Sequence, residues 1–137
     1  MRTALDTNIL SLVWSGAPEA TAIIAQLLSV RADGALVVSA PVFVELSAVP
    51  GLTVPIVRKA LDEASIEIDF DPGEDVWQLA AARFAAYATR RRSSGGGLPK
   101  RLVADFVIAA HALLRADRLM TRDANRYALD FPNLRLI

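Results

Sequence analysis

Short apolar runs without a polar face alternate along this chain with segments whose apolar residues recur at helical spacing. The runs at residues 3–5, 35–39 and 118–121 predict buried strands, and residues 66–70 and 134–137 predict two more. Helices are predicted between them, at about residues 9–14, 18–32, 41–49, 54–64, 74–92, 101–116 and 125–129. Strands that lack a polar face must be covered on both sides. We therefore predict an α/β fold, a three-layer α/β/α sandwich with a central parallel sheet of about five strands.

Length and composition limit the chemistry that this fold can carry. The 137 residues fit one domain, residues 1–137, and 53% of them are hydrophobic, which excludes an extensively disordered protein. The chain has no cysteine, which excludes disulfide scaffolds, thiolate zinc sites, iron–sulfur clusters and thiol catalysis. The single histidine, His111, excludes a metal site with two imidazoles. Carboxylate oxygen remains, and it suits Mg²⁺ or Mn²⁺.

Charge and hydropathy patterning indicate where the chain acts. Fifteen basic and fifteen acidic residues give no net charge, so the total charge does not indicate a nucleic-acid binder. A neutral chain can still carry a basic rim beside an acidic pocket. The first ten residues do not form a signal peptide, and no uncharged apolar stretch is long enough to span a bilayer. We expect a cytoplasmic protein with no membrane contact.

Four acidic residues are expected at one edge of the predicted sheet. Asp6 ends the first strand, Asp123 follows the strand at 118–121, and Glu45 lies about one turn into the helix that follows the second strand. Asp105 lies in the first turn of the helix that precedes the strand at 118–121. Sites in open parallel sheets lie beyond the carboxyl ends of the strands, so these four carboxylates are predicted to converge there.

Such a cluster is typical of a cation site. Carboxylates gathered against an apolar wall raise one another's pKa and destabilise the fold unless a cation neutralises them. One or two hard cations held there can lower the pKa of a bound water and hold a phosphodiester for in-line attack. The polar residues beside the acids are predicted to orient water or phosphate through hydrogen bonds: Thr7, Asn8, Thr121 and Asn125.

Each acid also has a structural interpretation. Asp6 and Asp123 are suited to cap the helices that follow them, and Asp105 would be favoured in a first helical turn by the helix dipole alone. Glu45 among apolar residues would then need a partner arginine. The hypothesis of a catalytic site therefore depends on all four carboxylates meeting at one edge. His111 is interpreted as a packed core histidine, because it lies in an apolar helix.

Basic residues are concentrated between the long helix and the helix at 101–116. The residues concerned are Arg90, Arg91, Arg92, Lys100 and Arg101. They are candidates for a basic rim that binds RNA phosphates. The alternative is an ordinary solvated helix end, where arginines complement the helix dipole.

Four segments of this sequence resemble the PIN domain family, and within it the small single-domain (VapC-like) ribonucleases that act as toxins of toxin–antitoxin pairs. The segments are L-D-T-N-I-L at 5–10, S-A-P-V-F-V-E-L at 39–46, D-F-V-I-A-A-H-A at 105–112 and L-M-T-R-D at 119–123. They occur in the family's order and cover essentially the whole chain. This set of four with its spacing is specific, although the first and third segments are common patterns on their own.

The resemblance implies a site and an activity. The family's acidic site falls on Asp6, Glu45, Asp105 and Asp123, with Glu45 completing a metal shell formed chiefly by the three aspartates. Asn8 and Thr121 match polar positions of the family. The resemblance also implies dependence on Mg²⁺ or Mn²⁺, cleavage of single-stranded RNA, a homodimer, and a small antitoxin that inserts a basic residue near the acids.

We therefore expect a metal-dependent endoribonuclease that hydrolyses RNA by attack of a metal-activated water. The alternative is a non-catalytic member of the same fold that binds nucleic acid or protein; the repulsion among four intact acids argues against it. An aspartyl-phosphate phosphatase would need a second aspartate two residues after Asp6, where this chain has Asn8. A dinucleotide-dependent dehydrogenase would need G-x-G-x-x-G after a strand, which the sequence lacks.

Overall fold

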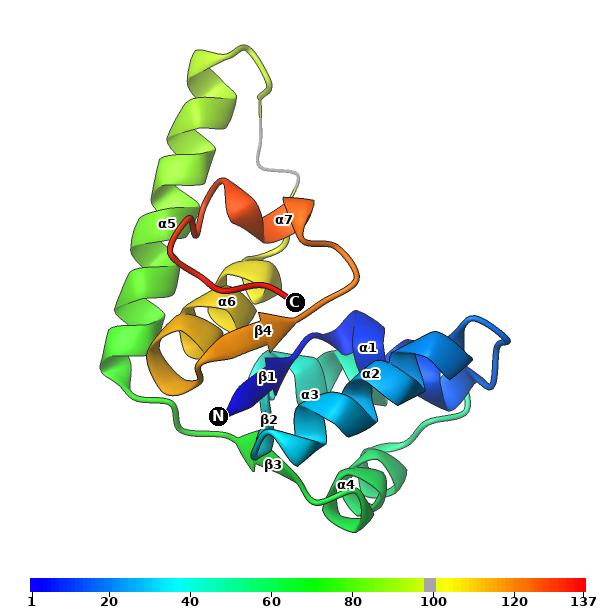
Figure 1. The fold of residues 1–137 in the computed structure, drawn as a ribbon. Coiled ribbons are helices and arrows are strands. Elements are labelled where there is room, and N and C mark those ends of the chain that lie inside the picture. The colour runs from blue at the N-terminus through cyan, green and yellow to red at the C-terminus, as the bar shows by residue number, and fades with distance from the viewer. Residues whose placement is uncertain (98–100) are drawn as a thin grey trace.

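The computed structural model describes residues 1–97 and 101–137, and within them four short strands form one parallel sheet (Figure 1). The sheet order is β3-β2-β1-β4. The strands are β1 (Thr3–Leu5), β2 (Leu36–Ser39), β3 (Ile66–Asp69) and β4 (Arg118–Met120). Every residue of β1, β2 and β4 is buried, as expected for parallel strands covered on both faces.

Helices cover both faces of this sheet. In Figure 1, α1 to α4 lie on one side of it, and α5 and α6 lie on the other. This arrangement follows from right-handed crossovers, because the chain moves from β1 to β2 to β3 in one direction and then returns to the far edge as β4. The helices are α1 (Thr7–Ser15), α2 (Ala20–Ala32), α3 (Ala40–Ser47), α4 (Val54–Glu63), α5 (Glu74–Ser93), α6 (Val103–Arg115) and α7 (Asn125–Ala128). The predicted three-layer α/β/α architecture is confirmed.

The predicted fifth strand is the main difference from the expected fold. Residues 134–137 follow β4 in parallel, but they form a single bridge, between Leu119 and Leu136, instead of a continuous strand. Two backbone hydrogen bonds support that bridge, from Leu119 N to the carbonyl of Arg135 and from Ile137 N to the carbonyl of Leu119. The prediction of about five strands is therefore corrected to four strands and one bridge, with one further backbone hydrogen bond from Thr121 N to the carbonyl of Ile137.

The long helix α5 departs in one detail from its expected packing. We expect Trp77 to point inward, but it is 47% exposed. The apolar residues of α5 are spread around much of its circumference, so their spacing does not determine which face is buried. Further along the helix, Phe84 and Tyr87 do pack inward, with ring centroids 5.1 and 5.5 Å from that of Phe106 on α6. None of the helices in the described part of the chain is both long and apolar enough to cross a bilayer.

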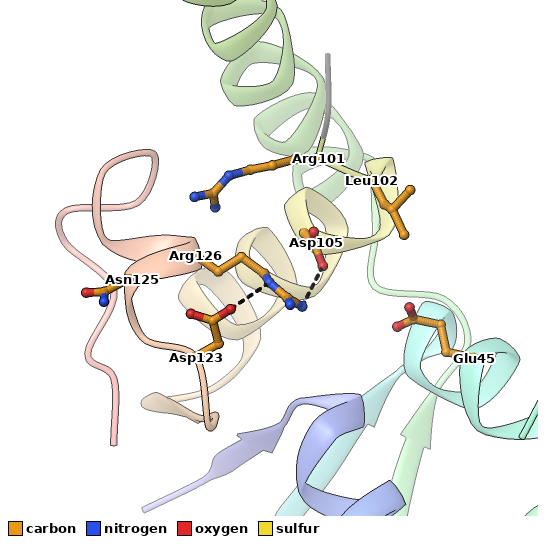
Figure 2. Close-up of a pocket in the computed structure, with 7 residues that line it drawn as sticks. All are labelled: Glu45, Arg101, Leu102, Asp105, Asp123, Asn125 and Arg126. Atoms are coloured by element: carbon orange, nitrogen blue, oxygen red, sulfur yellow. Dashed lines mark ion pairs between the residues drawn. The ribbon is translucent and has the colours of Figure 1, made fainter.

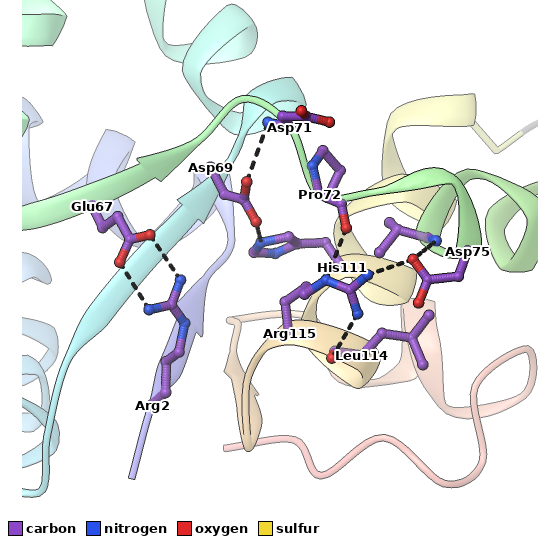
Figure 3. A network of polar contacts seen from close by, with 10 residues as sticks. Arg2, Glu67, Asp69, Asp71, Pro72, Asp75, His111, Leu114 and Arg115 are labelled. Atoms are coloured by element: carbon purple, nitrogen blue, oxygen red, sulfur yellow. Dashed lines mark hydrogen bonds and ion pairs between the residues drawn. The ribbon is translucent and has the colours of Figure 1, made fainter.

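His111 joins α6 to the end of β3. It is fully buried, and its Nε2 lies 3.1 Å from Oδ2 of Asp69 (Figure 3). Burial lowers the pKa of this imidazole, so at neutral pH its Nε2–H donates to the carboxylate. The loop after β3 adds two hydrogen bonds beside this pair. The backbone amide of Asp71 donates to the carboxylate of Asp69, and Nε of Arg115 on α6 donates to the carbonyl of Pro72. The prediction of a packed core histidine is confirmed, and its role is to fix α6 against the sheet.

Candidate active site

Asp6 is the most buried of the four predicted acids, with 2% of its surface exposed. It follows β1 directly and caps α1, because its Oδ1 accepts from the amide of Thr7 at 2.7 Å. Its Oδ2 accepts two further hydrogen bonds at 2.8 Å each, from the hydroxyls of Thr121 and Tyr127. The capping role considered above is thus real, and the remaining two bonds fix the plane of the carboxylate as well.

Thr121 links the loops after β1 and β4. Its Oγ1 donates to Asp6 and accepts from the amide of Asp123 at 3.1 Å. The side-chain amide of Asn8 lies 3.4 Å from the same oxygen, and Asn8 Oδ1 accepts from the amide of Arg122 at 3.2 Å. Because β1 and β4 are neighbours in the sheet, these short polar side chains tie the two loops together at its carboxyl edge.

Glu45 reaches the same edge from α3. Its Oε1 accepts from the hydroxyl of Thr7 at 2.6 Å, so its partner is a threonine and not the arginine that a purely structural glutamate would need. Partial burial raises the pKa of this carboxyl, the negative charges of Asp105 and Asp6 raise it further, and the hydrogen bond from Thr7 opposes them. Glu45 is therefore electrostatically coupled to two of the other predicted acids.

Asp105 and Asp123 share one arginine. Arg126 of α7 places Nη1 3.5 Å from Oδ1 of Asp105 and Nε 3.2 Å from Oδ2 of Asp123 (Figure 2). Burial raises the pKa of the Asp105 carboxyl, the charge of Arg126 lowers it, and the charge of Asp6 raises it again. Asp105 remains coupled to Asp6 in spite of its ion pair with Arg126.

These side chains surround an open pocket of about 390 Å³. Figure 2 shows Glu45 on one side of it, Asp105 at the start of α6, and Asp123 and Arg126 opposite. The lining residues are Glu45, Arg101, Leu102, Asp105, Asp123, Asn125 and Arg126. Asp6, at the end of β1, does not line this pocket but is electrostatically coupled to Glu45 and Asp105, which do. Residues from four separate segments therefore meet at the carboxyl edge of the sheet.

Oxygen donors at such an edge suit a hard divalent cation such as Mg²⁺ or Mn²⁺ in their chemistry. Their spacing is less suitable as it stands. Among residues 1–97 and 101–137, no three acidic or histidine side chains lie close enough together to form a ready metal-binding group. The two carboxylates of Asp105 and Asp123 are turned toward a guanidinium instead. The donor set therefore suits a divalent cation in its chemistry, while Arg126 holds two of its carboxylates.

The predicted basic rim is distributed over several places. Arg101 lines the pocket. Arg90 pairs with the buried Asp130 and stacks on the ring of Tyr87, while Arg91 and Arg92 make contacts within their own helix end, to the carbonyl of Gly96 and the hydroxyl of Thr89. Lys100 lies outside the described residues.

The family model for the PIN domain matches residues 3–132. The chain belongs to the PIN domain family. That match includes every predicted site residue, and the similarity to the family inferred from the four sequence segments is thereby confirmed.

Solved structures with the same PIN fold come from bacterial complexes. A chain of VapBC2 from Rickettsia felis, bound to a DNA fragment from its promoter, is 21% identical, with a TM-score of 0.65 over 100% of this chain and 98% of that one. A chain of VapBC-1 from nontypeable Haemophilus influenzae is 20% identical, with a TM-score of 0.65 over 100% of this chain and 97% of that one. A chain of FitAcB from Neisseria gonorrhoeae is 20% identical, with a TM-score of 0.60 over 98% of this chain and 96% of that one. At these identities the likeness establishes the fold. The comparison with curated proteins gave no match.

Arg126 and Tyr127 are site residues that the sequence did not predict. Both lie on α7, and both reach carboxylates that are far from α7 along the chain: Asp105 for the arginine and Asp6 for the tyrosine. Burial and the charge of Asp6 raise the pKa of the Tyr127 phenol, so it stays protonated and donates. The one sequence signal was the i,i+3 spacing of Asp123 and Arg126, which is typical of an ion pair on a helix.

Glu45→Gln is expected to stabilise the metal-free PIN domain at neutral pH. Because the pKa of Glu45 in the folded state lies above its ordinary value of 4.5, ionised Glu45 lowers the free energy of unfolding. This loss is complete at a pH above the raised pKa and is absent at a pH below 4.5. The glutamine keeps the acceptor for Thr7 and removes the charge, so the gain at pH 7 should be below about 1 kcal/mol for a half-exposed group. The difference should close as the pH falls through the raised pKa.

Urea unfolding of both proteins in EDTA, at steps between pH 7 and pH 4, measures this difference. A gain in the free energy of unfolding that stays the same at every pH would show that the charge of Glu45 is not its cause.

Proposed function

We propose that this PIN domain is a metal-dependent endoribonuclease that hydrolyses RNA phosphodiester bonds with Mg²⁺ or Mn²⁺, and that it is the toxin of a toxin–antitoxin pair. The observation that carries the proposal is an open pocket at the carboxyl edge of the sheet that Glu45, Asp105 and Asp123 line, with Asp6 electrostatically coupled to two of them, Glu45 and Asp105. Carboxylates held this close to one another repel, and a divalent cation would offset that repulsion.

The family supports this activity, since PIN domains are generally nucleases that use divalent metal ions. The similar folds in VapBC and FitAB complexes support a small antitoxin protein as partner. We propose a second copy of the chain as the other protein partner and the cytoplasm as the place of action.

The proposed mechanism assigns a task to each side chain. A divalent cation bound at the pocket would lower the pKa of a water molecule and stabilise the charge that develops on the phosphate. Asp6, Asp105 and Asp123 would hold the cation, with Glu45 completing its shell. Thr121 and Tyr127 keep the carboxylate of Asp6 in one orientation, so its rotation is already restricted before a ligand arrives. Thr7 does the same for Glu45.

The RNA chain would lie across the open side of this pocket. Arg101 lines that side, and its guanidinium is suited to a phosphate because its donors match two phosphate oxygens at once. We propose that Arg91, Arg92 and Lys100 extend this contact. Arg90 would contribute less, since its charge is already paired with Asp130. Asn8 and Asn125 are proposed to orient water or phosphate beside the acids.

Cleavage of a single-stranded RNA by the purified protein tests the proposal. We expect cleavage with Mg²⁺ or Mn²⁺ and none with excess EDTA, and we expect added Mn²⁺ to restore it. Titration of Mn²⁺ into the metal-free protein serves as an independent control. A chain that neither binds Mn²⁺ nor cleaves RNA would contradict the proposal.

That outcome would favour the second candidate function, a non-catalytic PIN domain that binds nucleic acid or protein. One observation favours it: Arg126 already neutralises two of the four acids, as a permanent structural ion pair would.

A further inference from the structure

Arg126 lies at the position where a cation is required. Its guanidinium contacts Asp105 through Nη1 and Asp123 through Nε, so one side chain spans two carboxylates that come from different segments. These are two of the three aspartates to which the proposed function assigns the metal. Arg126 lines the pocket, and Figure 2 shows its side chain reaching toward both Asp105 and Asp123.

The electrostatics of the pocket centre on this guanidinium. Burial alone would lower the pKa of Arg126, but the negative charges of Asp105, Asp123 and Asp6 raise it above its ordinary value. The same positive charge acts on Glu45, where it partly opposes the rise in the pKa of that carboxyl that burial causes. One arginine therefore interacts with all four acids, which is the relation that a divalent cation would have to them.

The ion pairs of Arg126 are partly open to water, so they can break and form again. The side chain of Arg126 is 39% exposed and that of Asp123 is 45% exposed, whereas that of Asp105 is only 12% exposed. Ion pairs that water can reach are weak, because both charges keep much of their hydration when they separate. A guanidinium held in this way can leave when a stronger cation competes for the same oxygens.

We infer that Arg126 is an exchangeable counter-ion: it occupies the place between Asp105 and Asp123 in the metal-free protein, and it must release both before they can hold a divalent cation. The inference rests on the proposed metal site. It accounts for two observations together, namely that one guanidinium bridges Asp105 and Asp123, and that the described residues contain no ready group of three ligands. Metal and Arg126 then exclude each other, and this competition sets the metal concentration at which the enzyme becomes active.

Calorimetric titration with Mn²⁺ tests the inference on the metal-free protein and three variants. Arg126→Gln removes the competitor and should tighten Mn²⁺ binding roughly three- to tenfold, the size expected when two partly exposed ion pairs no longer oppose it. Arg126→Lys keeps the charge but loses the planar fork that spans both carboxylates, so its affinity should lie between the two. Arg122→Gln is the matched control: it removes the same charge from an exposed neighbour of Asp123 and should change the affinity less than about twofold.

The outcomes separate this inference from the proposed function. Mn²⁺ affinity that is unchanged or weaker in Arg126→Gln, or an equal rise in Arg122→Gln, would overturn the exchange. Failure of every protein to bind Mn²⁺ would remove the metal site and the inference with it. If Mn²⁺ binds but RNA is not cleaved, the nuclease function fails, and the comparison of affinities still decides whether Arg126 competes. Circular dichroism of each variant confirms that the fold is intact.

Discussion

Asp105→Asn should reduce metal-dependent RNA cleavage more than about 100-fold, because changes to residues that merely support a metal ligand already cost 10- to 100-fold. The substitution keeps the size of the side chain and removes a negative charge from a residue that is 9% exposed. It loses the ion pair with Arg126, but it also relieves the repulsion from Asp6, so the free energy of unfolding should change little. Loss of activity would then reflect the site and not the fold.

The measurement compares cleavage rates of wild type and variant with saturating Mn²⁺, alongside thermal unfolding. Asp62→Asn is a suitable control, since it makes the same chemical change on an exposed position of α4, where Asp62 pairs only with Arg58 among the described residues. Cleavage by Asp105→Asn at close to the wild-type rate would eliminate the four-carboxylate site.

Phe106→Ala should produce the largest loss of stability, about 3–5 kcal/mol. Phe106 is the neighbour of Asp105 on α6 and is 2% exposed. Its ring lies at the centre of an aromatic cluster, 5.1 Å from Phe84, 5.5 Å from Tyr87 and 6.1 Å from Phe131. Removal of the ring leaves a cavity between α5, α6 and the C-terminal segment, and the surrounding rings can only partly fill it.

Denaturant unfolding of the metal-free protein measures this effect. Leu129→Ala removes a large apolar side chain from a position that is 71% exposed, so it should change the free energy of unfolding by less than about 0.5 kcal/mol. A loss for Phe106→Ala that is no larger than the loss for this control would show that the aromatic cluster does not hold α6 in place.

The sequence predicted best those features that depend on neighbouring residues. A short, largely apolar run that ends at Asp6 identifies both a buried strand and the carboxylate at its carboxyl end, because a parallel strand covered on both faces is mostly apolar. The same logic located Glu45, Asp105 and Asp123 relative to the sheet. Local spacing also identified His111 as a core residue.

Features that depend on distant contacts were not predictable in this way. The hydrogen bond from Tyr127 to Asp6 joins residues 121 positions apart, and nothing near Tyr127 in the sequence indicates that partner. Trp77 was assigned to the wrong side because apolar residues occur on several faces of α5. Residues 134–137 have the composition of a strand, but the extent of their pairing with β4, a single bridge, is not encoded in their own spacing.

The attachment of Asp6 to Thr121 and Tyr127 has a consequence for the order of events during synthesis. A ribosome releases β1 and its aspartate first, and the two hydroxyls that orient this carboxylate follow 115 and 121 residues later. β4 and α7 must emerge before the site can close, and such long-range closure is intrinsically slow. A chain that has emerged only as far as α6 therefore carries Asp6 without these partners, and the carboxylate is held in its final orientation only after residue 127 has been made.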